Sequence, residues 1–371
     1  MRLLDRYLLR QLLVPLGYCL SGFLLLWVAQ DLITELSSLQ RRKLLAGDIA
    51  EYYLVKTPEF LVLILPMALL LSLLYALSDH ARHHELTAIR ASGVSLWRLC
   101  VPYFAVGALA SMVCLGVNEL FVPDSADAAE QIRTRRLPPP AGTPGRNKIV
   151  NLCFTNSRDG RVWRIGVYDV RTGEMIEPVV SFGAGDGSRR LLNADRAARV
   201  GGVWTFYNAR EYKEGELDMP LLKTNVLREP LFSETPEEIR SEIKISAALG
   251  RFSMRSTKKA DLPIVEIANY LRLHPNPPQA AAIYTKLHGR LATPWTCLVV
   301  VLIAIPFGAP SGRRNVFVGV AGSVVIFFLY FILQQSCLAL GPGGTLPAWV
   351  AGWLPNLAFG LAGAYMMSRV R

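Results

Sequence analysis

The sequence lacks the motifs by which most nucleotide-binding and hydrolytic enzymes are recognised. It has no G-x-x-x-x-G-K-S/T segment, which excludes ATP binding by a phosphate loop in this chain. It has no G-x-S-x-G elbow, and the H-E-x-x-H pattern fails because Leu86, Thr87 and Ala88 follow His84-Glu85. We therefore expect neither catalysis nor a bound cofactor in this chain.

Histidine is scarce, and three of the five histidines form one cluster. A spacing of four places His80 and His84 on the same face of a predicted short helix, with His83 beside them. Two imidazoles next to Glu85 make an incomplete site, because a structural zinc ion takes four ligands. The sequence therefore favours a solvated polar helix that holds no metal.

Cysteine is scarce outside the apolar segments. The chain has six cysteines, and only Cys153 lies in its polar middle part. A single cysteine there excludes a disulfide within that part.

Charged residues are also few, at 19% of the sequence, although the formal net charge is +11. The basic excess lies mainly at the ends of apolar segments, where membrane proteins usually keep it. The charge therefore gives no reason to expect nucleic acid as a partner.

What the sequence does contain is six long apolar runs, divided three and three by a long polar block. A hydrocarbon core about 30 Å thick takes about 20 apolar helical residues to cross. We therefore predict a membrane protein with six transmembrane α-helices in a 3+3 arrangement. The runs are Leu12–Ile33, Phe60–Leu77, Trp97–Val117, Pro294–Gly308, Val316–Leu340 and Leu346–Met367.

Basic residues in the short loops predict the orientation of these helices. Two apolar runs separate each basic cluster from the next. Because two crossings return the chain to the same side, all four clusters must share one side of the membrane. The loop after the first run is an exception, but Asp48, Glu51 and Glu59 offset its basic residues. These basic residues are Arg41, Arg42, Lys43 and Lys56. We expect both termini in the cytoplasm and the middle block on the opposite side. The clusters are Arg2, Arg6 and Arg10; Arg82, Arg90 and Arg98; Arg313 and Arg314; and Arg369 and Arg371.

The middle block has the period-two alternation of β-strands after a breaker cluster at Pro138-Pro139-Pro140. Repeated short strands separated by glycine-containing turns predict an all-β sandwich, roll or barrel. Apolar residues at helical spacing predict one short helix over Ile264–Leu273. The predicted strands are Ile149–Thr155, Val162–Val170, Leu191–Val200 and Val203–Tyr212, with turns at Asp159-Gly160, Thr172-Gly173 and Gly201-Gly202.

Several segments together resemble the lipopolysaccharide export permeases, the LptF/LptG family. The segment Glu85–Gly93 matches the family form E-L-x-A-x-R-A-S-G of a short cytoplasmic helix. The other matching segments are Leu65–Leu70, Asn118-Glu119 with Pro123, His288–Pro294, Ile305–Gly308 and Trp353–Asn356. These segments lie in both apolar halves.

The resemblance implies a permease subunit of an ABC transporter in the bacterial inner membrane. Two such permeases pair and bind a dimer of a cytoplasmic ABC ATPase, which supplies the ATP and Mg site. The complex extracts lipopolysaccharide and passes it through jelly-roll-like periplasmic domains to a bridge protein of the LptC/LptA kind. The expected segments are 1–122 (first transmembrane half, with a coupling helix at about 80–95), 123–288 (periplasmic β-domain) and 289–371 (second half).

The resemblance also implies which residues contact the ATPase. The short helix would be the coupling helix, with Glu85 pairing with a basic group of the ATPase. Gly93 would end the helix as its C′ residue, and Ser92 or Ser95 would cap the next helix. The implied coupling residues are Glu85, Leu86, Arg90, Ser92 and Gly93.

The substrate contacts depart from the family pattern. Some family members carry lysines near the outer end of the first helix that meet lipid phosphates, whereas this chain has Asp31 and Glu35 there. We expect Arg41, Arg42 and Lys43 to substitute for them, and the alternative is an exposed basic cluster with no substrate role. For the chain as a whole, the alternative is a non-transporting, membrane-anchored envelope protein whose β-domain binds a periplasmic partner.

Overall fold

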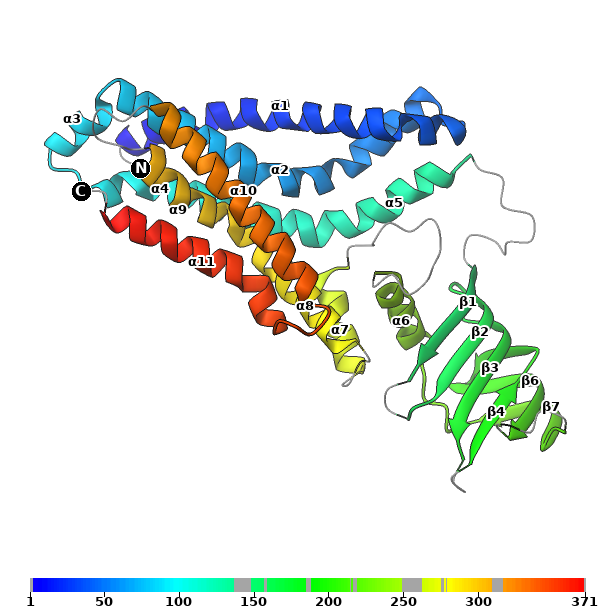
Figure 1. Ribbon diagram of the computed structural model, residues 1–371. Helices are drawn as coiled ribbons and strands as arrows, with labels where there is room; N and C mark the ends of the chain where they lie inside the picture. Colours follow the sequence, from blue (N-terminus) through cyan, green and yellow to red (C-terminus); the bar gives the residue numbers. More distant parts are fainter. Residues whose placement is uncertain are drawn as a thin grey trace. The chain divides into compact units, whose positions relative to one another are not determined.

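The computed structural model describes residues 3–136, 148–156, 159–184, 188–213, 215, 219–248, 262–274, 277, 279–308 and 316–369. It divides into two compact units (Figure 1). The helical unit comprises Met1–Leu137 and Ala281–Arg371, and the β unit comprises Pro138–Ala280. The predicted segment boundaries near residues 122 and 288 concern the crossing of the membrane and stay predictions. The breaker cluster at Pro138-Pro139-Pro140 and the loop arginines Arg313 and Arg314 lie outside the described residues.

The first half of the helical unit is continuous helix with short connections. The first two helices lie side by side, and α5 packs on α2 (Figure 1). A π-helical turn, η1, joins α4 to α5 without a loop. The elements are α1 (Leu3–Arg41), α2 (Ala46–Arg82), α3 (Glu85–Ala91), α4 (Leu96–Gly116), η1 (Val117–Phe121) and α5 (Val122–Thr134).

The second half is organised around α9, which contacts α2, α4, α10 and α11. Its buried side chains are mainly Val and Ile, so it is apolar on every side and forms the centre of the unit. The elements are α8 (Ala280–Ala292), η2 (Thr293–Trp295), α9 (Thr296–Gly308), α10 (Val316–Leu340) and α11 (Ala348–Arg369).

Five helical segments of the described chain are long and apolar enough to cross a membrane. They confirm a membrane protein with membrane helices before and after an inserted β region in the sequence. The predicted count of six membrane helices is not confirmed. The last predicted run became α11, which is not among the five. The five segments are Leu3–Arg41, Ala46–Arg82, Trp97–Ser125, Ala280–Gly308 and Ala321–Leu340.

Asn356, the buried polar residue of α11, points into the unit. The Asn356 side-chain amide donates to the carbonyl of Ala292 at 2.7 Å, and the Tyr330 hydroxyl donates to Asn356 Oδ1 at 2.6 Å. The hydroxyls of Tyr330 and Thr296 are 2.7 Å apart. A Cβ on Gly352 would lie 2.7 Å from the His288 backbone. The helix therefore packs closely on its neighbours, and its buried amide is satisfied inside the protein.

The described part of the β unit is one antiparallel sheet of seven strands. Six of them follow the order β1-β2-β3-β4-β6-β5. Strand β7 also pairs with β6, and β3 pairs with both β4 and β5. The helices α6 (Pro236–Ala248) and α7 (Ile264–Leu273) follow the sheet. The strands are β1 (Lys148–Thr155), β2 (Val162–Asp169), β3 (Met175–Gly183), β4 (Arg189–Asn193), β5 (Arg196–Val200), β6 (Val203–Lys213) and β7 (Leu222–Glu229).

The predicted strand Leu191–Val200 is interrupted, because Ala194 and Asp195 separate β4 from β5. Both pieces pair with the long strand β6, so β4 and β5 together occupy the place of one interrupted strand in the sheet. Gly201 and Gly202, with φ of 61° and 85°, form the predicted turn from β5 to β6. Strands β3 and β7 and helix α6 were not predicted.

The core of the β unit is aromatic and contains the buried carboxylate of Glu234. Trp163, Trp204 and Phe232 are in ring contact in this core. Glu234 accepts hydrogen bonds from the Trp163 indole at 3.0 Å and from the Asn156 amide at 2.7 Å. Its carboxylate also pairs with buried Arg161 at 3.3 Å. The segment before α6 is thereby fixed to the sheet.

Candidate functional sites of the helical unit

The predicted coupling segment folds as a short helix with defined ends. Before α3, His84 has a positive φ of 58°, and after it Gly93 has a φ of 84°. A glycine in this conformation ends a helix at little steric cost. Ser95 Oγ then accepts from the amide of Arg98 at 3.3 Å and caps α4, so Ser95 rather than Ser92 is the cap.

Glu85, the first residue of α3, is tied to both long helices beside it. Its carboxylate lies 2.7 Å from His80 Nδ1 of α2. The Tyr7 hydroxyl of α1 donates to both carboxylate oxygens at 3.1 Å. The rings of Tyr7 and His80 are themselves 5.7 Å apart. Three helices thus meet at one carboxylate, and one of them, α1, is distant in sequence from the other two.

The electrostatics favour an ionised Glu85. Burial raises the pKa of this carboxyl group, but the hydrogen bonds from His80 and Tyr7 outweigh burial, so its pKa is lowered. Because the pKa of Glu85 is lowered in the folded state, these contacts stabilise the fold at any pH above the ordinary carboxyl pKa of about 4. The stabilisation is lost only as the pH falls through the lowered pKa.

The other predicted coupling residues differ in exposure. Leu86 is buried in the core of the helical unit with Leu99 and Tyr103. Ser92 and Gly93 are exposed, and Ser92 Oγ donates to the Ile89 carbonyl at 2.7 Å. The side chain of Arg90 lies outside the described part. Among the side chains of α3 that the structure describes, those of Thr87, Ala88 and Ala91 are exposed, and exposed Ser92 follows the helix.

Tyr7 and His80 were not predicted as members of this site. Tyr7 is 78 residues away from Glu85 in the sequence, and no local spacing indicates their contact. His80 was considered only as a metal ligand. The structure directs His80 to Glu85 and places His83 Nδ1 3.5 Å from Asp79. Within the described residues, no group of three metal-ligating side chains comes together.

A buried ion pair joins α1 to α2 in the other half of their length. Lys56 Nζ lies 2.9 Å from Asp31 Oδ2, with side-chain exposures of 7% and 20%. The ammonium group also lies over the rings of Tyr52 and Phe60, 5.4 Å and 4.8 Å from their centroids. The expectation that Lys56 belongs to a loop is wrong, because α2 begins ten residues earlier, at Ala46.

Further along, the same helices carry a network of charges with α5. Glu35 pairs with Arg133 at 3.1 Å, and Arg42 Nη1 donates to the Arg133 carbonyl at 3.4 Å. Asp48 pairs with Arg136 at 2.6 Å and with Arg135 at 3.4 Å. We call the charged side chains of this network the α1–α2–α5 polar end. They are Glu35, Arg42, Asp48, Glu51, Arg133, Arg135 and Arg136.

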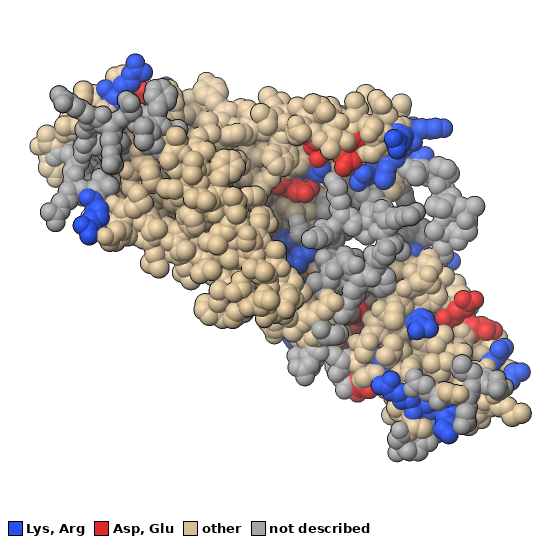
Figure 2. All heavy atoms as spheres, in the orientation of Figure 1, with Lys and Arg blue, Asp and Glu red and all other residues tan. Residues whose placement is uncertain are grey.

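The basic trio predicted from the sequence lies at this polar end. Arg41 and Lys43 are exposed, and Arg42 is half-buried. The sequence did not indicate Arg133, Arg135 and Arg136, because about 90 residues separate them from the trio and only packing of α5 on α2 brings them near. Figure 2 shows charged side chains towards the two ends of the helical unit and an uncharged surface between them.

The π-helical turn η1 is held by an arginine from the second half of the chain. Arg290 Nη2 of α8 donates to the Asn118 carbonyl at 2.5 Å and to Asn118 Oδ1 at 3.2 Å. π-Helical turns are rare and are frequently found at functional sites. The contact joins the two halves of the helical unit across the chain interval occupied by the β unit.

These features define a class. The chain is a multi-pass membrane protein in which one helical half precedes and one follows an inserted β region in the sequence, with charged contacts towards both helix ends. The family model of the lipopolysaccharide export system permeases LptF/LptG matches residues 6–369. The chain therefore belongs to the LptF/LptG family. A comparison with curated proteins found no match.

The Asp31–Lys56 pair gives a direct test of the packing of α1 on α2. Asp31→Asn should lower the free energy of unfolding by about 3–5 kcal/mol, because it leaves a buried ammonium without its charge partner. Asp31→Asn with Lys56→Met should cost much less than the sum of the single changes. Thermal unfolding of the full chain in detergent measures both.

The control is Arg98→Met, which removes the more exposed pair with Asp5 at 3.0 Å. It should change stability by about 1 kcal/mol or less. Strict additivity of the Asp31 and Lys56 changes would show that the two groups do not interact.

Proposed function

We propose that this chain is a permease subunit of an ATP-driven transporter that extracts lipopolysaccharide from the bacterial inner membrane. The observation that carries the proposal is the family match over residues 6–369, which spans both helical halves and the β unit. In this proposal the chain itself performs no covalent chemistry. It supplies a membrane path for the lipid, a docking element for an ATPase and a β unit that hands the lipid onward.

The proposed partners are a second permease of the same family, a dimer of a cytoplasmic ABC ATPase that binds ATP and Mg, and an LptC/LptA-like periplasmic bridge protein. A helical unit with no phosphate loop needs a separate ATPase to drive transport. Co-purification of the chain with an ATP-binding subunit tests this assembly. A chain that recruits no ATPase would instead be a non-transporting envelope protein.

The proposed orientation places both termini in the cytoplasm and the β unit in the periplasm. The basic residues near α1 and the α2–α4 connection support it, because such residues are retained on the cytoplasmic side. Cytoplasmic placement also brings α3 to the side on which an ATPase would bind.

Single cysteines distinguish the two sides. In a chain whose exposed native Cys153 is replaced by Ser, a cysteine at Asp159, in the β unit, should react with a membrane-impermeant thiol reagent in intact spheroplasts, and one at exposed His83 should not. Both variants should react fully after the membrane is permeabilised, which controls for accessibility. Labelling of His83→Cys but not Asp159→Cys would reverse the orientation.

The proposed coupling element is α3, whose Glu85 contacts Tyr7 of α1 and His80 of α2. A force applied to the exposed face of α3 would reach α1 through Tyr7 and α2 through His80. Glu85 is about one-third exposed, so one edge of its carboxylate can accept a basic group of the ATPase while its present partners stay in place.

Glu85→Ala should weaken ATP-driven lipopolysaccharide release from proteoliposomes that contain the complete transporter. Tyr7→Phe keeps the carboxylate and removes one internal donor, so it separates the two roles of Glu85. If Glu85 contacts the ATPase, its removal should reduce ATPase co-purification about 5- to 100-fold and Tyr7→Phe should not. An equal loss in both variants would make Glu85 a positioning residue only.

Asp79→Ala serves as the matched control, since Asp79 is a carboxylate of the same end of α2 that contacts His83. It should leave ATPase recruitment near the wild-type level. Wild-type recruitment and release by Glu85→Ala would remove the coupling role.

The proposed substrate contact is the basic trio at the α1–α2–α5 polar end. Lipopolysaccharide carries phosphates, and exposed cations attract them, each by about 1 kcal/mol near an anionic lipid surface. The side chains of Arg41 and Lys43 make no hydrogen bond or ion pair to the residues that the structure describes, and the backbone amide of Lys43 donates to the carbonyl of Gln40. By contrast, the Arg135 and Arg136 side chains are engaged by Glu51 and Asp48.

Replacing Arg41, Arg42 and Lys43 by Gln should therefore reduce photo-crosslinking of lipopolysaccharide to the reconstituted complex by tenfold or more, at about fivefold per cation. Arg135→Gln with Arg136→Gln removes two cations of the same end and should have a smaller effect. An effect of the control as large as that of the trio would mean that the site recognises net charge only.

A further inference from the structure

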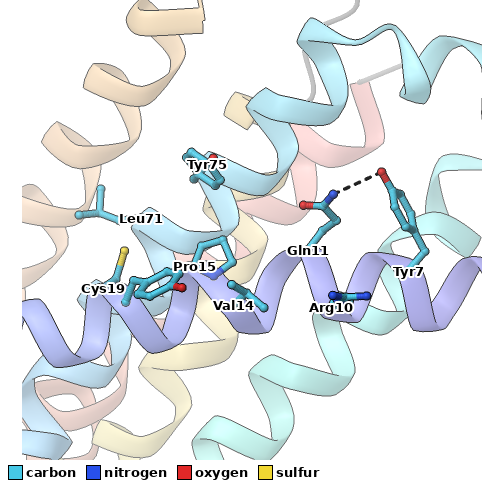
Figure 3. Close-up of a pocket in the computed structure, with 9 residues that line it drawn as sticks. Tyr7, Arg10, Gln11, Val14, Pro15, Cys19, Leu71 and Tyr75 are labelled. Carbon is cyan, nitrogen blue, oxygen red and sulfur yellow. Dashed lines mark hydrogen bonds between the residues drawn. The ribbon is translucent and has the colours of Figure 1, made fainter.

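A pocket lies between α1 and α2, towards the end that carries α3 (Figure 3). Its volume is about 750 Å³, within the range of small-molecule sites. The proposed function does not use it. The lining residues are Tyr7, Arg10, Gln11, Val14, Pro15, Tyr18, Cys19, Leu71 and Tyr75.

The lining changes in character along α1. Tyr7, Arg10 and Gln11 form a polar start, and Val14 and Cys19 continue it as an apolar wall. Arg10 and Cys19 are nine residues apart, so the lining from the charge to the apolar end covers about 14 Å of helix. A polar region followed by an apolar one matches the head group and the hydrocarbon chain of an amphiphile.

The aromatic residues agree with a position at a membrane interface. Tyr18 and Tyr75 are 74% and 60% exposed and come from different helices. Tyrosine is enriched at the depth of lipid head groups, because its ring is apolar and its hydroxyl is polar. Arg10 belongs to α1, a helix that is long and apolar enough to span a membrane.

We propose that this pocket binds an anionic phospholipid of the cytoplasmic leaflet. Its phosphate lies against Arg10, and its glycerol and upper acyl chains lie along Val14, Leu71 and Cys19 between the tyrosine rings. The proposal rests on the proposed orientation, which puts this end of α1 at the cytoplasmic face. It does not rest on transport of lipopolysaccharide, which enters from the opposite leaflet.

Charge complementarity selects a lipid over a protein segment as the occupant. Among the described lining residues, Arg10 is the charged side chain, and no carboxylate shares the pocket with it. A protein helix packed there would need to bring its own acid into an apolar surface to pair with Arg10, which is costly. A phospholipid brings its negative charge at the depth where the head groups already lie.

The occupied pocket would also act on α3. Tyr7 forms part of the wall, accepts from Gln11 Nε2 at 3.4 Å and donates to Glu85. A lipid packed against Tyr7 restricts the ring that holds Glu85, so binding should make α3 more rigid. The lipid is thus a regulator of the coupling element rather than a substrate.

Native mass spectrometry of the purified, delipidated full chain tests the site. The probes are phosphatidylglycerol and phosphatidylcholine with identical acyl chains. Wild type should retain phosphatidylglycerol preferentially, and Arg10→Gln should reduce this retention about fivefold, as expected for one cation at an anionic lipid. Arg6→Gln is the matched control, because exposed Arg6 precedes Arg10 by one turn of α1 and does not line the pocket.

Val14→Trp separates a pocket from a charged surface. It fills the cavity and keeps Arg10, so it should also lower retention of phosphatidylglycerol, while unfolding temperatures confirm that each variant is folded. Hydrogen exchange of the α3 amides should slow with phosphatidylglycerol in wild type and not in Arg10→Gln.

Four results would overturn the proposal. They are equal retention of the two lipids, an equal loss in Arg6→Gln and Arg10→Gln, unchanged retention in Val14→Trp, and α3 exchange that does not respond to lipid. Two further arms identify the occupant. Displacement of phosphatidylglycerol by purified lipopolysaccharide would assign the pocket to the substrate, and loss of the Arg10-dependent lipid in the assembled complex would assign it to a protein partner.

Discussion

The helical unit depends on one constraint: a polar group among its apolar helices is costly unless it finds a partner inside the protein. Lipid offers no hydrogen bonds, so an unpaired group there costs several kcal/mol. Asn356 is bonded to Tyr330 and to the Ala292 carbonyl, Lys56 to Asp31, and Arg290 to Asn118. Each of these contacts joins two helices, so satisfying the polar groups also fixes how the helices pack.

The same constraint gives the two halves of α1 different roles. Towards its C-terminus, Asp31 and Glu35 hold α2 and α5 through Lys56 and Arg133. Towards its N-terminus, Tyr7 holds Glu85 and also lines the pocket beside Arg10. One helix thus contacts the proposed substrate end, the proposed lipid pocket and the proposed coupling element. A change in the position of α1 would be felt at all three places.

The β unit follows a different rule, because its core is closed by aromatic packing around a paired carboxylate. Trp163 and Phe232 surround the Glu234–Arg161 pair, and Ile239 of α6 is fully buried in the same core. Removing one member of such a pair leaves a buried charge, which is more costly than never having the pair. The sheet and the segment that leads to α6 therefore form one folded unit.

The sequence by itself determined the elements whose cause is local. Apolar runs placed the long helices, glycine turns placed the β5–β6 hairpin, and helical spacing placed α7 at Ile264–Leu273. The motif from Glu85 to Gly93, together with matching segments in both apolar halves, indicated the family. A break of two residues, Ala194-Asp195, was too short to interrupt the predicted strand.

Only the tertiary structure decided which distant residues meet. Tyr7 reaches Glu85 across 78 residues, Arg133 reaches Glu35 across 98, and Lys56 proved to be a helix residue rather than a loop residue. Periodicity reports the face of an element but not its neighbour, since contacts between elements depend on how whole helices pack. The sequence therefore determined the class of protein and its elements, and packing decided the composition of its sites.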